Sequence, residues 1–263
     1  MKIKEPTAIK WAIYYWVGAL LQIGMVCGIT ALFKARQIQQ GVVISVLLLA
    51  IGGLSTAFWG VMISKRSKKV SSYKQVVFDF FNMKQPIRLY LLVLGFLGIL
   101  FGKQILLGEF QGHIKVYMFF SIFIQAILFG GIEEIGWRYT FQPIMEEHMA
   151  FEGASIITFI SWGIWHYLYF YMTGTIHTIQ HASFLIGLLG SCFILGALYK
   201  VGKSLWICVL YHALLNMFSQ TLLPTTLFQT LLINGIGIIL AIIIVKKKRS
   251  IGVEESLTMN SNE

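Results

Sequence analysis

The chain has 263 residues, of which 57% are hydrophobic and only 12% are charged, and its formal net charge is +10. A soluble domain carries about 25% charged residues, so this composition excludes an ordinary soluble protein and predicts an integral membrane protein. A positive charge can also indicate nucleic-acid binding. Here the basic residues are distributed as in a membrane protein, and we expect no nucleic-acid partner.

Eight apolar runs follow one another, each of roughly 20 residues, the length that a helix needs to cross a hydrocarbon core of about 30 Å. The alternating pattern of a β-barrel is absent, so we predict an all-α, polytopic bundle of about eight transmembrane helices. The first run exceeds the roughly 7–15 apolar residues of a signal peptide, and we expect it to be retained. The expected spans are about 11–33, 42–63, 87–107, 115–138, 154–172, 181–199, 204–222 and 227–245.

The basic residues predict the orientation of these spans. With the N-terminus inside, 17 of the 21 Lys and Arg residues fall on the cytoplasmic side, Arg138 among them. The four near the other face are Lys34, Arg36, Lys103 and Lys115. By the positive-inside rule both termini are cytoplasmic, and we expect a multi-pass protein of a bacterial cell membrane.

The organisation outside the spans is simple. Residues 1–249 are expected to form one transmembrane domain, followed by a polar, disordered cytoplasmic tail over residues 250–263. The longest soluble segment is 64–86, and its run VVFDFFNM predicts an amphipathic stretch that lies along the membrane interface.

Ionisable residues stand at the end of the fourth expected span, in the stretch GGIEEIGWRYTF over residues 130–141. An ionisable group inside the membrane costs about 2.5–3.5 kcal/mol on insertion scales and usually faces a protein interior or a cavity. Glu134 and Arg138 are four residues apart, so a regular helix would pair them on one face. Glu133 points about 100° away on such a helix and has no partner there, which makes it the candidate for chemistry.

Two histidines and an asparagine lie in other spans. His166 is in the fifth span, whereas His212 and Asn216 are four residues apart in the seventh and share a helical face. A single histidine of this kind is more often a hydrogen-bonded packing residue than a catalytic one. Together with the acids of the fourth span, however, these residues predict a site in the cytoplasmic half of the membrane. A carboxylate in such a cleft is suited to activate water, and the polar side chains to stabilise an oxyanion.

Other chemistries for an intramembrane protease fit less well. An aspartyl site needs two aspartates, and Asp79 is the only one in the chain. No HExxH motif is present, and no serine lies in a Gly-x-Ser-Gly context. Two histidines and a carboxylate are a common catalytic zinc set, so zinc held by Glu133, His166 and His212 stays open as an alternative to a glutamate-activated water without a cofactor.

The motifs EExxxR in EEIGWR, aromatic-xxx-His in WGIWH and HxxxN in HALLN follow in this order. In this order they resemble the CPBP (Abi) family of intramembrane endopeptidases, which includes the type II CAAX prenyl endopeptidases. The resemblance covers about residues 125–220, within an expected catalytic core at 115–222. Trp162 departs from the phenylalanine that the family more often has.

The resemblance implies that Glu133 activates the water and that His166 shares it. It implies further roles for four residues, of which Glu134 and Arg138 shape the site, while His212 and Asn216 hold the oxyanion. The partners expected are the lipid bilayer and a membrane-bound peptide or protein cut near the cytoplasmic face. Substrates in the family range from prenylated proteins and peptide signals to bacteriocin-related peptides, and nothing in the sequence chooses among them or sets the oligomeric state.

Two other classes of function are compatible with these residues. A proton-coupled transporter could use Glu133 and the histidines as titrating groups, although broken helices in related halves are missing. A non-catalytic immunity or scaffold protein could keep the same fold.

Overall fold

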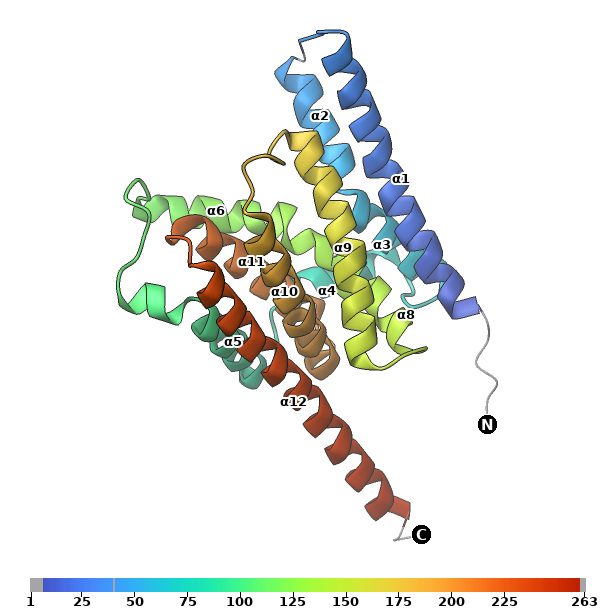
Figure 1. The fold of residues 1–263 in the computed structure, drawn as a ribbon. Helices are drawn as coiled ribbons and strands as arrows, with labels where there is room; N and C mark the ends of the chain where they lie inside the picture. Colours follow the sequence, from blue (N-terminus) through green and yellow to red (C-terminus); the bar gives the residue numbers. More distant parts are fainter. Residues whose placement is uncertain (1–6, 40, 261–263) are drawn as a thin grey trace.

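In the computed structural model, residues 7–39 and 41–260 are described, and their regular structure is helical (Figure 1). Within this part of the chain, the one exception is an isolated bridge between Phe110 and Leu222. The all-α bundle expected from the sequence is therefore confirmed.

Five stretches of helix are long and apolar enough to cross a membrane, and a sixth arises if a pair bent by 41° counts as one span. The five lie in α1 (Thr7–Ala35), α5 (Ile87–Leu106), the stretch Val116–Glu146, α10 (His181–Gly202) and α12 (Leu227–Asn260). The bent pair is α2 (Val42–Gly53) and α3 (Ser55–Arg66).

The two remaining predicted spans also form helices, although these two do not meet this criterion of length and composition. They are α9 (Phe151–Thr173) and α11 (Leu205–Thr221). The α11 helix has only 17 residues, and tryptophan, tyrosine and histidine lower the hydropathy of α9. Both helices carry candidate site residues.

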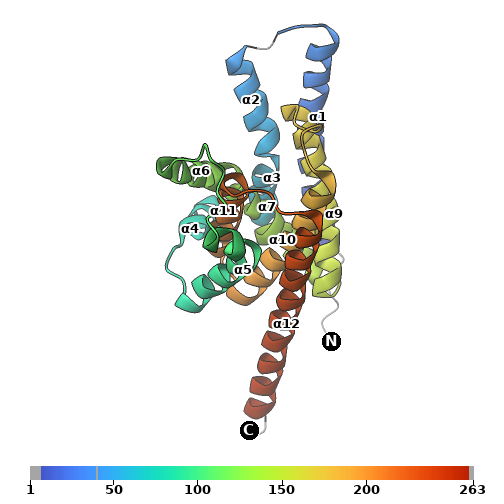
Figure 2. The same cartoon turned by 60° about the vertical axis from the view of Figure 1, so that its left-hand side comes forward.

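The connections between helices gather at two opposite ends of the bundle (Figures 1 and 2). We name one the lysine-rich end, defined by the connections 67–72, 147–150 and 203–204. The other is the lysine-poor end, defined by the connections 107–115, 174–180 and 222–226. The first helix begins and the last helix ends on the lysine-rich side, as the alternation of the spans requires.

The chain between α6 (Val116–Phe129) and α8 (Gln142–Glu146) is not the regular helix predicted over 115–138. A 3₁₀ turn at Gly131–Glu133 leads into the short α7 (Glu134–Gly136), and a π-helical turn follows at Trp137–Phe141. The α6 helix itself runs across the direction of α1 and α12 in both views (Figures 1 and 2). The candidate acids therefore lie on a break in the helix, a place where functional residues are often found.

Small residues and one hydroxyl hold this break in place. The α3 helix approaches α7 so closely that a Cβ on Gly60 would lie 2.7 Å from the carbonyl oxygen of Ile135. The hydroxyl of Thr140 lies 2.7 Å from the same carbonyl oxygen and donates to it. A side-chain hydrogen bond of this kind is one of the contacts that stabilise a distortion in a helix.

The soluble segment forms α4 (Tyr73–Phe81), the amphipathic helix that the sequence predicted. It buries Phe80 and leaves Phe78 exposed. The hydroxyl of Tyr139, in the π-helical turn, donates to Asp79 at 2.6 Å. The α4 helix therefore fixes the break from the lysine-rich side.

The C-terminal helix α12 continues to Asn260, into the segment 250–263 that the sequence identifies as a polar tail. Residues 261–263 lie outside the described residues, and the disorder of the segment stays a prediction.

Candidate active site

Glu133 ends the 3₁₀ turn and is 5% exposed. Its Oε2 accepts a hydrogen bond of 2.7 Å from Nε1 of Trp162, on α9. The spacing of residues predicted no partner for Glu133 in its own helix, and the structure supplies one from another helix. Trp162, the departure from the family's phenylalanine, therefore contacts the candidate carboxylate directly.

Glu134 lies beside Glu133 but has a different environment, with a side chain that is fully buried. Its Oε1 lies 3.5 Å from Nη1 of Arg138, so the predicted ion pair is present although the turn between them is irregular. The same oxygen lies 2.6 Å from Nδ1 of His212 on α11. A carboxylate only accepts hydrogen bonds, so this contact places a hydrogen on Nδ1 and leaves Nε2 available to water or substrate.

Arg138 does not face the cytoplasm, where the charge count placed it, because its side chain is fully buried in the bundle. The guanidinium carbon lies 4.2 Å from the ring centroid of Trp162, a cation–π contact. Nη2 donates to the carbonyl oxygen of Ser191 on α10 at 3.5 Å. Arg138 therefore balances the charge of Glu134. It also packs against the Trp162 ring, whose N–H donates to Glu133. The other 16 Lys and Arg residues that were counted on the predicted cytoplasmic side still outnumber the four on the other side.

His166 follows Trp162 by one helical turn. Its Nδ1 donates to the carbonyl oxygen of Trp162 at 3.0 Å, since a carbonyl can only accept. The Trp162 ring meets the imidazoles edge to face, with centroids 5.1 Å from His166 and 5.4 Å from His212. One tryptophan thus contacts the carboxylate, the guanidinium and both histidines of the site.

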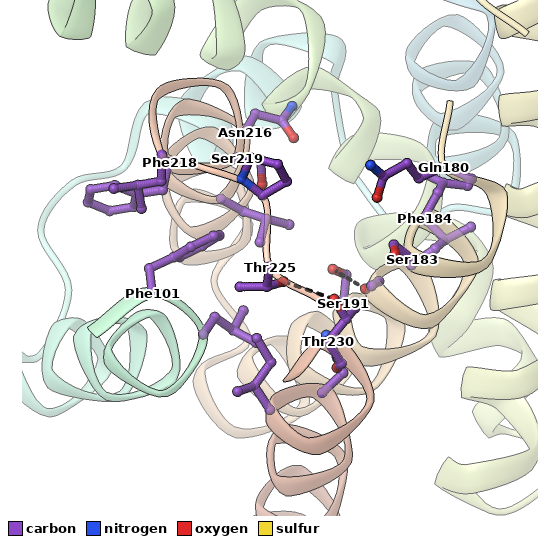
Figure 3. Close-up of a pocket in the computed structure, with 18 of the residues that line it drawn as sticks. Phe101, Gln180, Ser183, Phe184, Ser191, Asn216, Phe218, Ser219, Thr225 and Thr230 are labelled. Carbon is purple, nitrogen blue, oxygen red and sulfur yellow. Dashed lines mark hydrogen bonds between the residues drawn. The ribbon is translucent and has the colours of Figure 1, made fainter. Parts of the chain in front are cut away.

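A cavity of about 380 Å³ opens beside these groups (Figure 3). Trp162, His166, His212 and Asn216 line it, and the rest of its lining comes from α5, α10, α11, α12 and the connections before α10 and after α11. The carboxamide of Asn216 rests against Gly130, where a Cβ would overlap it. The helical break and α11 therefore meet at the cavity.

The six residues singled out from the sequence are brought together in two groups. Glu134 contacts both Arg138 and His212, whereas His166, His212 and Asn216 line the cavity. Glu133 joins them through Trp162.

Sequence reasoning missed two features of the site. One is the N–H of Trp162. The other is Asn234, a buried amide in the last apolar run that lines the far side of the cavity. Asn234 could have been found as a polar residue within a predicted span.

The zinc alternative requires Glu133, His166 and His212 to converge on one point. Among the described residues, no group of three His, Cys, Asp or Glu side chains is placed to hold a metal ion. Each histidine donates from Nδ1 to another partner, as metal-ligating histidines that coordinate through Nε2 also do, and Glu133 accepts from the indole of Trp162. Zinc therefore stays an alternative to the glutamate mechanism, and the metal-removal experiment below tests it.

A comparison with protein families agrees with the motifs. The model of the family described as "Type II CAAX prenyl endopeptidase Rce1-like" matches residues 113–218, from the connection before α6 into α11. This segment contains all six candidate residues. No curated protein matches the chain.

Proposed function

We propose that the chain is an intramembrane endopeptidase that uses a water activated by Glu133, because its residues 113–218 match the model of the type II CAAX prenyl endopeptidase Rce1-like family. The observation that carries this proposal is the buried carboxylate, which an indole N–H holds beside a cavity lined by two histidines and an asparagine. Such a site joins a base, oxyanion donors and restricted access of water.

In the proposed reaction Glu133 removes a proton from a water molecule, whose oxygen forms a bond with the carbonyl carbon of the substrate. His166 accepts a hydrogen bond from the same water through Nε2. The proton then passes from Glu133 to the nitrogen of the leaving amine as the carbon–nitrogen bond breaks. No cofactor takes part in this scheme.

His212 and Asn216 are assigned the stabilisation of the negative charge that develops on the carbonyl oxygen. Glu134 accepts the hydrogen bond from Nδ1 of His212 and thereby orients the ring. When the ring also carries a hydrogen on Nε2, that N–H donates to the oxyanion. The carboxamide of Asn216 supplies a second donor. Each such donor contributes about 10²–10³-fold to the rate in enzymes where it has been removed.

The glutamate mechanism is tested by removing metal from the purified protein. We expect the cleavage of a model membrane peptide to persist after the protein is stripped with a chelator and dialysed. Adding zinc back should not raise the rate. Cleavage that disappears on stripping and returns with zinc would overturn the mechanism and assign Glu133, His166 and His212 as ligands.

A second prediction concerns the indole of Trp162. Trp162→Phe keeps an aromatic ring over Arg138 but deletes the N–H that Glu133 accepts from. A hydrogen bond to a charged group contributes about 1.5–3 kcal/mol, so we expect kcat to fall about 10–100-fold with little loss of thermal stability.

Trp165→Phe is the matched control, because Trp165 is equally buried on the same helix and donates to Ser55 at 2.8 Å, away from the carboxylates. Equal kcat losses in the two variants would show that the Trp162 bond has only a structural role.

A further inference from the structure

Besides the cavity at the candidate site, the bundle has a groove between α1 and α3, with a volume of about 860 Å³. It runs from Trp11 to Met25 on α1 and from Phe58 to Arg66 on α3, and we name it the α1–α3 groove. The α1 helix follows one outer side of the bundle (Figure 1). None of the six candidate site residues lines this groove, so the proposed reaction does not account for it.

The walls of the groove are apolar and exposed. Leu21, Met25 and Phe58 line it, and about half or more of the surface of each side chain is exposed. The α1 helix is long and apolar enough to cross a membrane, and α3 belongs to the bent pair that forms a further candidate span. Exposed apolar surface on such helices faces hydrocarbon rather than water. The walls therefore fit an apolar chain.

The floor of the groove carries two polar side chains that are already paired. The Trp59 ring lies across α1 at Gly18, where a Cβ would be 2.3 Å from the indole. Its Nε1 donates to Oε1 of Gln22 at 3.0 Å, and Nε2 of Gln22 donates to the carbonyl oxygen of Ile51 at 2.7 Å. Polar groups in hydrocarbon need such internal partners. The middle of the groove therefore suits a hydrocarbon chain.

One end of the groove is charged. Arg66 is the last residue of α3, beside the lysine-rich connection 67–72, and its side chain is exposed. Among the described residues that line the groove it is the one charged side chain, and no ion pair or hydrogen bond joins its guanidinium to them. Trp11 and Tyr14 line the same end, and such residues are typical of the membrane interface. A guanidinium matches the geometry of a phosphate, so this end fits an anionic headgroup.

The groove is long enough for an acyl chain. Trp11 and Met25 are 14 residues apart, which at 1.5 Å per residue gives about 21 Å along α1. The hydrocarbon core is about 30 Å thick, so the chains of one leaflet reach about 15 Å inward from the interface. A chain whose headgroup lies at Arg66 can therefore stay in the groove over its whole depth.

A transmembrane helix fits the groove less well, whether it comes from a second copy or from another protein. Membrane helices approach one another closely over small residues. Among the described residues that line the groove, Gly18 is the only small one, and the Trp59 ring already covers it. An apolar helix would also leave Arg66 without an anion.

We propose that the α1–α3 groove binds an anionic phospholipid of the leaflet at the lysine-rich end, with an acyl chain along α1 and the phosphate on Arg66. The site adjoins the support of the helical break, because Trp59 precedes Gly60, which lies against the carbonyl oxygen of Ile135. A lipid in the groove holds α3 against the break from outside. The inference does not depend on the endopeptidase activity.

The site is tested in phosphatidylcholine bilayers that contain a small fraction of a lipid with brominated acyl chains, which quench tryptophan fluorescence on contact. The brominated lipid is phosphatidylglycerol in one series and phosphatidylcholine in the other. The part of the quenching that disappears in Trp59→Phe reports the groove. We expect phosphatidylglycerol to reach half of this quenching at a fraction about fivefold lower than phosphatidylcholine, the preference that one basic residue gives. Added salt should weaken the preference.

Three variants assign the preference to the guanidinium. Arg66→Gln should remove it, and Arg66→Lys, which keeps the charge, should retain part of it. Arg88→Gln is the matched control and should leave it unchanged. Arg88 is also exposed and lies at the same end of the bundle, where its neighbour Leu89 packs against Gly202, but it does not line the groove.

Equal quenching by the two lipids, or a preference that survives Arg66→Gln, would overturn the proposal. A preference lost equally in Arg88→Gln would do the same, because the general charge of this end would then attract the lipid. A second copy in the groove is tested with Leu21→Cys, since the natural cysteines are buried. A disulfide-linked dimer of this variant in the bilayer would show that protein rather than lipid covers the groove.

Discussion

Glu133→Gln is expected to reduce cleavage to background while the protein folds and still binds its substrate. The substitution keeps the shape of the side chain, and its amide oxygen can still accept the Trp162 N–H. It removes only the ability to take a proton from water. If Glu133 is the base, no other carboxylate can replace it, because Glu134 is already engaged by Arg138 and His212.

The control for this variant is Glu152→Gln. Glu152 also carries a carboxylate, but it lies at the lysine-rich start of α9 and pairs loosely with Lys246 at 3.8 Å. Its loss should leave kcat/KM unchanged. Substrate binding is followed by crosslinking of a labelled peptide, so that lost chemistry is separated from lost binding. Cleavage by Glu133→Gln at the rate of the unmodified protein would refute the mechanism. A folded wild-type protein that binds but never cuts would favour the scaffold alternative.

The sequence predicted the helical class because apolar runs near 20 residues have few other structures open to them. It could not predict the break between Gly130 and Phe141. That break depends on contacts from distant residues, such as the close approach of Gly60 and the hydroxyl of Thr140. The i, i+4 spacing of Glu134 and Arg138 indicated a regular helix. The ion pair is present, but the backbone between the two residues is not a regular helix.

The members of the candidate site could be found because ionisable side chains inside an apolar chain are costly and therefore few. Their arrangement could not be found in the same way. The hydrogen bond between Trp162 and Glu133 depends on how α9 is rotated relative to the 3₁₀ turn. The spacing of residues in the sequence does not determine this rotation. The end of the bundle at which the cavity opens likewise depends on how α10 and α11 pack, which the spacing of residues does not show.

Arg138→Met is expected to destabilise the fold more than any other single change considered above. Arg138 and Glu134 both have fully buried side chains, and removing one partner of a buried pair costs about 3–5 kcal/mol because the other charge is left uncompensated. Methionine keeps most of the apolar stem, so the loss reports the charge rather than a cavity. The free energy of unfolding in detergent and the folded yield measure it.

The comparison that isolates the charge is the double variant Glu134→Gln with Arg138→Met. It leaves no unpaired charge, and glutamine still accepts from Nδ1 of His212, so it should be more stable than Arg138→Met alone. Lys200→Met is the control on a partly exposed pair, Lys200 with Glu146 at 2.5 Å, and should cost less than about 1 kcal/mol. Strictly additive losses in the double variant would mean that Glu134 and Arg138 do not stabilise each other. The contacts of Arg138 with Trp162 and Ser191 would then account for its burial.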